Sequence, residues 1–151
     1  MTADQRLRFS EVALKRLYPR TKTFSAPARS FYRNSEVAER YWDAEYEPEF
    51  DLVLISQIIH GLSYSQCDKL IKRSVNALAP GGRMLVHDGI LSEDRTFPYH
   101  ASLFSVYMLA TTERGRSYTF NEVREWMTNA GLSDIRRIEI DTDSEIIEGV
   151  K

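Results

Sequence analysis

FDLVLISQIIHGLSYSQCDKLIKRSVNALAPGGRMLVHD, which spans residues 50–88, has the pattern of a strand, a helix and a second strand. Residues 51–55 form a nearly continuous apolar run, as expected of a strand that is covered on both faces. A helix is expected from Ser65 to the turn at residues 80–82, and a second buried strand over residues 83–87. The apolar residues of this helix recur every three or four positions: Cys67, Leu70, Ile71, Val75 and Leu78. A right-handed crossover would make the two strands parallel.

Two further helices are predicted downstream of this unit. Residues 101–111 have helical periodicity. The helix that follows has clearer signals at both ends. Thr119 and Glu122 have the spacing of a capping box, and Gly131 can adopt the left-handed conformation that ends a helix.

The last residues predict a closing antiparallel hairpin. Residues 134–140 and 145–150 are strand-like, and the polar residues between them form a short linker. Parallel strand–helix–strand units that end in such a hairpin indicate an α/β fold, with a mostly parallel sheet and helices on both faces.

Residues 1–49 give weaker patterns than residues 50–151. We therefore expect a degenerate N-terminal segment, residues 1–49, followed by a better-defined region, residues 50–151. A helix is predicted over residues 9–18, because Pro19 would end it. Short strands are predicted near residues 22–25 and 37–41.

The composition is that of one globular domain. The chain has 151 residues, of which 42% are hydrophobic and 28% charged, and its net charge is −2. Since no basic face is visible, nucleic acid is not expected as a partner. No apolar run approaches the ~20 residues that span a bilayer, and the polar N-terminus is unlike a signal peptide, so we expect a cytoplasmic protein without membrane association. The single cysteine, Cys67, excludes a disulfide framework, and no metal site is expected.

Polar residues follow both predicted central strands. Ser56, Gln57 and His60 come after the first strand, and His87 and Asp88 come at the end of the second. Parallel neighbours have their carboxyl ends at one edge of the sheet, where ligands bind in open α/β folds. A histidine that faces a carboxylate there can act as a general base, with the carboxylate fixing its tautomer. His60 and Asp88 are therefore the candidate catalytic pair.

Each of these residues also has a purely structural interpretation. A histidine after a strand is more often a loop or packing residue than a catalytic one, and Asp88 can simply cap the next segment. His87 is expected to point into a helix interface. The aromatic side chains of Phe104, Tyr107 and Trp126 are expected in the core rather than in a ligand site.

Three motifs occur in order along the chain: Phe50-Asp-Leu-Val-Leu-Ile-Ser-Gln-Ile-Ile-His60, Leu78-Ala-Pro-Gly-Gly-Arg-Met-Leu-Val-His-Asp88 and Gly115-Arg-Ser-Tyr-Thr119. Together they resemble the C-terminal catalytic region of the class I S-adenosylmethionine-dependent O-methyltransferases of the caffeate, hydroxyneurosporene and acetylserotonin type. The resemblance covers about residues 50–151. It implies a Rossmann-like sheet and transfer of a methyl group from S-adenosylmethionine to a hydroxyl group of a small molecule, typically a phenol.

The resemblance implies a role for the candidate pair. The family's catalytic histidine falls on His60, where it would deprotonate the acceptor hydroxyl. An acidic residue that supports this histidine falls on Asp88, which is shorter than the usual glutamate. A second supporting glutamate falls near Ser117, so that support is expected to be lost.

The resemblance also implies binding residues. Ser56 and Gln57 match positions that line the cofactor pocket, and Asp43 matches an acidic position near the adenine. Tyr107 and Met108 match a region that contacts the acceptor.

The upstream residues depart from the family. The family's catalytic domain begins with a strand and a Gly-x-Gly-x-Gly loop, whereas this chain has no glycine before Gly61. The acidic residue that should hold the ribose falls on Ser25. The lost strand normally lies beside residues 51–55, so we expect an unpaired edge there. A fragment of a longer enzyme, or half of a split gene, is the favoured explanation. Alternatively, the N-terminal segment fills the gap, or a partner does, as a homodimer or a complementing polypeptide.

Two functions from different classes remain open. The first is an O-methyltransferase that is active alone or when completed by a second polypeptide. The second is a non-catalytic remnant or regulatory subunit that keeps the fold and binds no cofactor. A nicotinamide-dependent oxidoreductase on the same fold would also need a glycine fingerprint, and His60 gives it no support.

Overall fold

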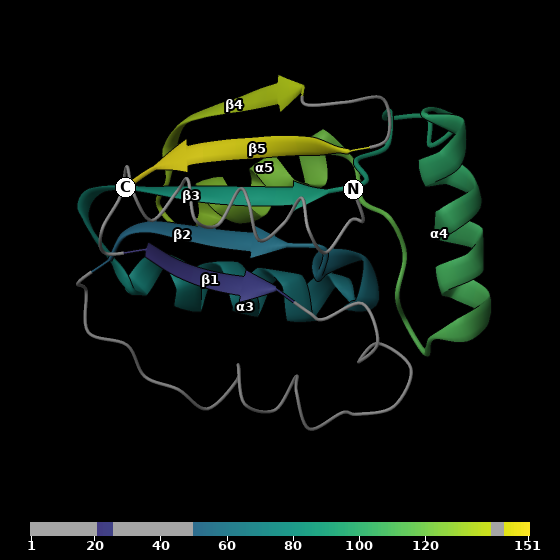
Figure 1. The fold of residues 1–151 in the computed structure, drawn as a ribbon, viewed down its shortest axis with the longest axis horizontal. Helices are drawn as coiled ribbons and strands as arrows, with labels where there is room; N and C mark the ends of the chain where they lie inside the picture. Colours follow the sequence, from purple (N-terminus) through teal and green to yellow (C-terminus); the bar gives the residue numbers. More distant parts are fainter. Residues whose placement is uncertain (1–20, 26–49, 140–143) are drawn as a thin grey trace, which may run out of the picture.

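A five-stranded mixed sheet forms the centre of the computed structural model, which describes residues 21–25, 50–139 and 144–151 (Figure 1). The strand order is β1-β2-β3-β5-β4. Two pairings, β1–β2 and β2–β3, are parallel, whereas β5 is antiparallel to both β3 and β4. The elements are β1 (Thr21–Ser25), β2 (Phe50–Ser56), the 3-10 turn η1 (Ile59–Gly61), α3 (Tyr64–Asn76), β3 (Leu78–Asp88), α4 (Tyr99–Thr111), α5 (Phe120–Asn129), β4 (Ser133–Glu139) and β5 (Glu145–Val150).

The predicted α/β fold is confirmed, but the sheet is mixed, with two parallel and two antiparallel pairings, where a mostly parallel one was expected. Within the described residues, α3 and α5 cover the same face of the sheet, so the expected helices on both faces are not seen there. The strand–helix–strand unit is present as β2, α3 and β3, and the last two strands form the expected antiparallel hairpin. The helix predicted at residues 9–18 and the strand predicted near residues 37–41 lie outside the described residues.

The edge of β2 is not open, so the expected unpaired edge is absent, and the alternative in which the N-terminal segment fills the gap is confirmed. β1 pairs with β2 in parallel along its whole length, from Thr21 opposite Leu52 to Ser25 opposite Ser56. β2 therefore has backbone partners on both sides. β-Branched threonines and an aromatic residue in the short sequence TKTFS favour the extended conformation that this pairing needs.

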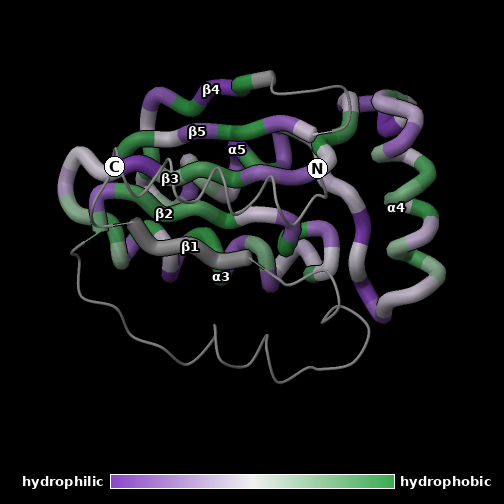
Figure 2. Tube along the Cα trace, in the orientation of Figure 1, coloured by the Kyte–Doolittle hydropathy of each residue, from purple (hydrophilic) through white to green (hydrophobic). Residues whose placement is uncertain are grey.

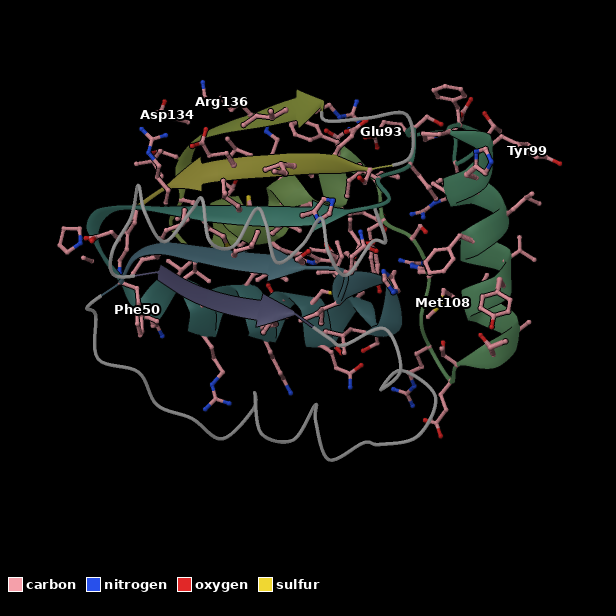
Figure 3. All side chains as sticks on the ribbon, in the orientation of Figure 1. Phe50, Glu93, Tyr99, Met108, Asp134 and Arg136 are labelled. Carbon is pink, nitrogen blue, oxygen red and sulfur yellow. The ribbon has the colours of Figure 1, made fainter. Side chains whose placement is uncertain are left out.

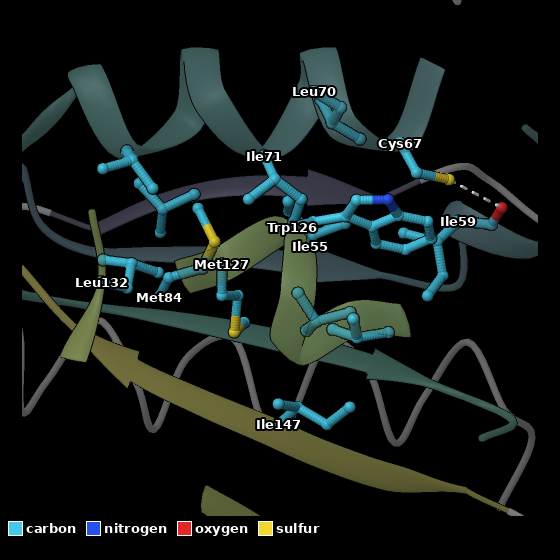
Figure 4. Close-up of a cluster of buried hydrophobic side chains, with 14 of the residues drawn as sticks. Ile55, Ile59, Cys67, Leu70, Ile71, Met84, Trp126, Met127, Leu132 and Ile147 are labelled. Atoms are coloured by element: carbon cyan, nitrogen blue, oxygen red, sulfur yellow. Dashed lines mark hydrogen bonds between the residues drawn. The ribbon is translucent and has the colours of Figure 1, made fainter. Parts of the chain in front are cut away.

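The core lies between one face of the sheet and the helices α3 and α5 (Figure 4). α3 begins one residue earlier than expected, because Ser63 and Gln66 form a capping box. The expected box of Thr119 and Glu122 at the start of α5 is confirmed. Figure 2 shows that β2 is hydrophobic along most of its length. Its alternate residues Leu52 and Leu54 belong to a second, smaller buried cluster on the other face.

The Pro-Gly-Gly sequence does not form the turn that was expected before β3. β3 already begins at Leu78, and the glycines lie within it, where the pairing with β2 is irregular between Phe50 and Leu52. Gly81 has a φ of +77°, and a Cβ on Gly82 would lie 2.8 Å from the carbonyl oxygen of Ala79. Both positions therefore favour glycine.

Helix α4 lies beyond the carboxyl ends of the parallel strands β1, β2 and β3, away from the face that α3 and α5 cover (Figure 1). It begins two residues before the expected start. Several of its large apolar side chains are exposed, including Leu103, Val106 and Leu109. Among the described helices, none is long and apolar enough to cross a bilayer.

Candidate active site

His60 lies on the short turn η1, directly after β2. The backbone leaves the strand sharply, because Gln57 has a φ of +56° while its N–H still donates to the carbonyl oxygen of His87 on β3 (2.9 Å). Within the turn, the N–H of Gly61 donates to Ile58 and that of Leu62 to Ile59. The side chain of His60 is thereby placed at the carboxyl edge of the sheet, with 5% of its surface exposed.

His60 and Asp88 meet at this edge, as predicted. The imidazole Nδ1 lies 2.7 Å from Oδ1 of Asp88, and the backbone N–H of His60 donates to Oδ2 (3.4 Å). Oδ1 also accepts the N–H of Gly89 (2.8 Å). Because the carboxylate accepts, Nδ1 is the donor, and the tautomer of the imidazole is fixed. Asp88 is only 1% exposed, so the pair is shielded from water.

Burial and the neighbouring Asp88 shift the pKa of His60 in opposite directions. Burial lowers the pKa of the imidazole, but the negative charge of Asp88 and its hydrogen bond raise it by more, so the pKa lies above its ordinary value of 6.5. Protonated His60 therefore adds stability that is fully present below pH 6.5 and is lost as the pH rises through the folded-state pKa. Above that pKa, the imidazole is neutral and can accept a proton.

Replacing Asp88 with asparagine should reverse the direction of this pKa shift. Asp88→Asn removes the charge, while the burial of His60 remains, so the imidazole pKa should fall below 6.5. Titration of the His60 ring signals by NMR measures this directly. The signals of the exposed His100 provide an internal reference in the same spectra. An unchanged His60 pKa would show that Asp88 does not control the imidazole.

Aromatic side chains of α4 cover the other side of His60. The ring of Phe104 meets the imidazole edge to face, with 4.8 Å between centroids, and Tyr107 stacks on Phe104 at 6.3 Å. Met108 is buried and lies on the same helix, as Figure 3 shows. The expectation of a core position is confirmed for Trp126, which is 1% exposed, but is wrong for Tyr107, which is 44% exposed. Sequence reasoning also missed that Phe104 contacts His60, because its helical spacing is that of a core residue.

A second polar cluster lies at the same edge of the sheet. Oγ of the fully buried Ser56 lies 2.8 Å from Nδ1 of His87, and Nε2 of His87 lies 3.1 Å from Oγ of Ser144. Val86 belongs to the core under α3 and α5, so the alternating His87 points to the opposite face, away from these two helices. The expected packing of His87 into a helix interface is therefore wrong with respect to α3 and α5.

Three more residues were singled out in the sequence: Asp43, Ser25 and Ser117. Asp43 lies outside the described residues. Ser25 ends β1 directly opposite Ser56, so it lies at the same edge of the sheet. Ser117 is buried, and its hydroxyl donates to the carbonyl oxygen of Ala101 on α4 (3.3 Å). This hydrogen bond links Ser117 to α4. As a serine, it supplies no carboxylate to His60 and Asp88.

Comparison with known proteins identifies relatives for most of the chain. Residues 26–133 match the family model of the O-methyltransferase domain. The chain is 37% identical over 89 residues to the tetracenomycin polyketide synthesis 8-O-methyl transferase of Streptomyces glaucescens, which covers 59% of this chain and 26% of that protein. It is 34% identical over 103 residues to the 3-hydroxy-5-methyl-1-naphthoate 3-O-methyltransferase of Streptomyces sahachiroi, with 67% and 30% covered. The chain thus spans less than a third of the length of these relatives.

Solved structures share the fold. A putative O-methyltransferase from Nostoc punctiforme matches with a TM-score of 0.69 and 34% identity, over 74% of this chain and 34% of its own. Human N-acetylserotonin methyltransferase, solved in complex with SAM, matches with a TM-score of 0.68 and 27% identity, over 74% and 32%. These matches confirm the Rossmann-like α/β architecture that the three sequence motifs implied.

Proposed function

The chain belongs to the family of the O-methyltransferase domain, and on this basis we propose that it transfers a methyl group from S-adenosylmethionine to a hydroxyl group of a small aromatic molecule. One observation carries the proposal. A buried histidine and a carboxylate, which can serve as a general base and its orienting partner, are in contact, 2.7 Å apart, at the carboxyl edge of the parallel strands. Ligands bind at this edge in α/β sheets.

His60 acts as the general base in this proposal. It would take the proton of the acceptor hydroxyl as the oxygen forms its bond to the methyl carbon, while the bond from that carbon to the sulfonium sulfur breaks and S-adenosylhomocysteine leaves. Asp88 holds the imidazole by Nδ1 and stabilises the imidazolium that forms. Since the displacement is in line, most of the acceleration comes from holding the acceptor in position and excluding water, which the buried pair favours.

The cofactor would supply an electrophilic methyl group on a sulfonium sulfur. The described residues fit only one side of such a molecule. We propose that Ser56 and Gln57 contact the cofactor, with Asp43 near the adenine. Gln57 is partly exposed at the sheet edge, whereas the hydroxyl of Ser56 is buried against His87, so Ser56 would contribute mainly through its backbone. The close backbone approach that a glycine-rich loop permits has no counterpart, because the first glycine of the chain is Gly61.

The acceptor would lie against α4. We propose that Tyr107 and Met108 contact it, because α4 packs against the turn that carries His60 and presents Phe104 to the imidazole. Aromatic side chains pack well against a flat, aromatic acceptor. The names of two relatives support this class, since one acts on a hydroxynaphthoate and another on N-acetylserotonin.

Calorimetric titration with S-adenosylhomocysteine tests the proposal. The intact chain should release or absorb heat with a single binding event, and Gln57→Ala should weaken the affinity. Lys72→Ala is a matched control, since Lys72 lies on the exposed side of α3 and pairs only with Asp68 among the interactions of the described residues. If millimolar ligand gives no heat, the isolated chain does not bind the cofactor.

A non-catalytic methyltransferase-like subunit is the second candidate. It is favoured by Ser25, a hydroxyl where the resemblance places a ribose-binding acid. The two candidates differ in what His60 contributes. Under the second, a His60→Ala variant should retain the biological role of the protein.

Association with a second polypeptide is also predicted. It is supported by the exposed apolar side chains of α4, because apolar side chains gathered on one exposed helix are typical of interaction sites. We expect a second copy of the chain to pack there, so light scattering after size-exclusion chromatography should give the mass of a dimer. If the chain is instead a monomer at a concentration on the order of tens of micromolar, the predicted partner is a complementing polypeptide.

Two broader expectations remain predictions. The cytoplasmic location is supported by the only cysteine, Cys67, which is buried and unpaired with any other cysteine. The division into residues 1–49 and 50–151 also stays a prediction.

A further inference from the structure

The turn that carries His60 is held through its carbonyl groups by residues that do not belong to the proposed catalytic pair. The hydroxyl of Tyr118 donates to the carbonyl oxygen of Leu62 (2.6 Å). The thiol of Cys67 donates to that of Ile59 (3.4 Å), as the dashed line in Figure 4 shows. Between them, Gly115 packs so closely that a Cβ on it would lie 2.6 Å from the carbonyl oxygen of His60.

Tyr118 is itself fixed to the segment that carries Asp88. The backbone N–H of Leu91, three residues after Asp88, donates to the carbonyl oxygen of Tyr118 (2.9 Å). Hydrogen bonds thus link three segments in a closed path. Leu91, just after Asp88, bonds to Tyr118, and Tyr118 bonds to Leu62. The chain then leads from Leu62 back to His60, which bonds to Asp88. Because this path is closed, a displacement of Tyr118 changes the position of His60 relative to Asp88.

Both donors keep their protons at neutral pH. Burial raises the pKa of the Tyr118 hydroxyl well above its usual range, and burial likewise raises the pKa of the Cys67 thiol. Each group therefore remains a donor to the turn. Tyr118 is the stronger of the two, because O–H···O bonds are shorter and stronger than those from a thiol.

We propose that Tyr118 is a positioning residue, whose hydroxyl and the adjoining Gly115 hold the His60 turn in the orientation at which the imidazole meets Asp88. The use of that orientation in methyl transfer rests on the proposed function. The positioning itself can be measured without cofactor or acceptor.

The test compares Tyr118→Phe with Tyr64→Phe in the full-length chain. Both variants lose one phenolic hydroxyl and keep a ring edge-to-face with Trp126, whose centroid lies 4.8 Å from Tyr118 and 4.9 Å from Tyr64. Tyr64 donates to Glu125 instead of to the turn. It is therefore a matched control for the loss of a hydroxyl beside the same tryptophan.

Two NMR measurements are made on each variant. One is the pKa of the His60 ring. The other is hydrogen exchange of the His60, Gly61 and Leu62 amides, relative to the amides of Val53 and Leu54 in β2. In Tyr118→Phe, the turn amides should exchange roughly tenfold faster or more relative to β2, because the half-buried carbonyl of Leu62 has lost its donor. The His60 pKa should fall toward 6.5 as the contact with Asp88 loosens.

Faster exchange with an unchanged His60 pKa would overturn the proposal, because Tyr118 would then only stabilise the turn. Equal changes in Tyr64→Phe would overturn it as well. Gly115→Ala provides a second route to the same readouts, because its Cβ would push on the His60 carbonyl from another direction. The two proposals can fail separately. If the wild-type chain binds no S-adenosylhomocysteine but Tyr118→Phe lowers the pKa of His60, the proposed function is contradicted and the positioning role stands.

Discussion

Replacement of His60 with alanine should lower the rate of methyl transfer by on the order of 10²–10⁴, as expected for the loss of a general base. The imidazole is the group that would take the proton of the acceptor hydroxyl, and its contact with Asp88 fixes its orientation. The assay is transfer of a labelled methyl group to a phenolic acceptor, under the conditions in which the wild-type chain is active, alone or completed by a second polypeptide.

A second variant separates catalysis from folding. His60→Ala leaves the buried carboxylate of Asp88 without its imidazole partner, which costs stability in itself. His60→Asn keeps a donor near the position of Nδ1 but has no group at the position of Nε2. It should therefore lose activity to a similar extent while unfolding closer to the wild type. His100→Asn, on the exposed part of α4, should keep full activity. Retention of the wild-type rate by His60→Asn would exclude His60 as the base.

Replacement of Trp126 with alanine should cost about 3–5 kcal/mol of the free energy of unfolding. Trp126 is the largest of the fully buried side chains and is 1% exposed. Its ring meets the rings of Tyr64 and Tyr118 edge to face. Trp126 lies where α5 packs against α3 and the sheet (Figure 4). Since a domain of this size is stable by only about 5–15 kcal/mol, this loss is a large part of the total.

Denaturant unfolding followed by circular dichroism measures this loss. Arg124→Ala is the control on the same helix, because Arg124 is exposed and its truncation should change the free energy of unfolding by about 0.5 kcal/mol or less. Equal effects of the two substitutions would show that Trp126 does not lie in the core of the folded chain.

Local sequence patterns correctly predict a helix or strand when the residues that start or end it lie within a few positions of it. The capping box of Thr119 and Glu122, together with Gly131 at a φ of +93°, correctly delimits α5. The last strand has the predicted bounds, Glu145–Val150. The start of α3 was displaced by one residue, because Ser63 caps the helix through Gln66 and several serines there are compatible with a helix start.

The pairing of β1 with β2 could not be predicted in the same way. A short strand near residues 22–25 was expected, but nothing in TKTFS specifies which strand it joins. The pairing is made by backbone groups, and its partner lies some thirty residues further along the chain. The contact between the rings of Phe104 and His60 could not be predicted either, because the two residues lie far apart along the chain and the helical spacing of Phe104 is that of a core residue.

The amino-acid pattern alone places His60 and Asp88 at one edge of the sheet, because each follows a buried strand and the two strands are parallel neighbours. The 2.7 Å contact between them comes from packing. The turn of His60 is held by Tyr118, whose hydroxyl bonds to a residue 56 positions away. Such a contact forms only after α5 and the loop before it have packed on the sheet, so its geometry cannot be deduced from spacing along the chain.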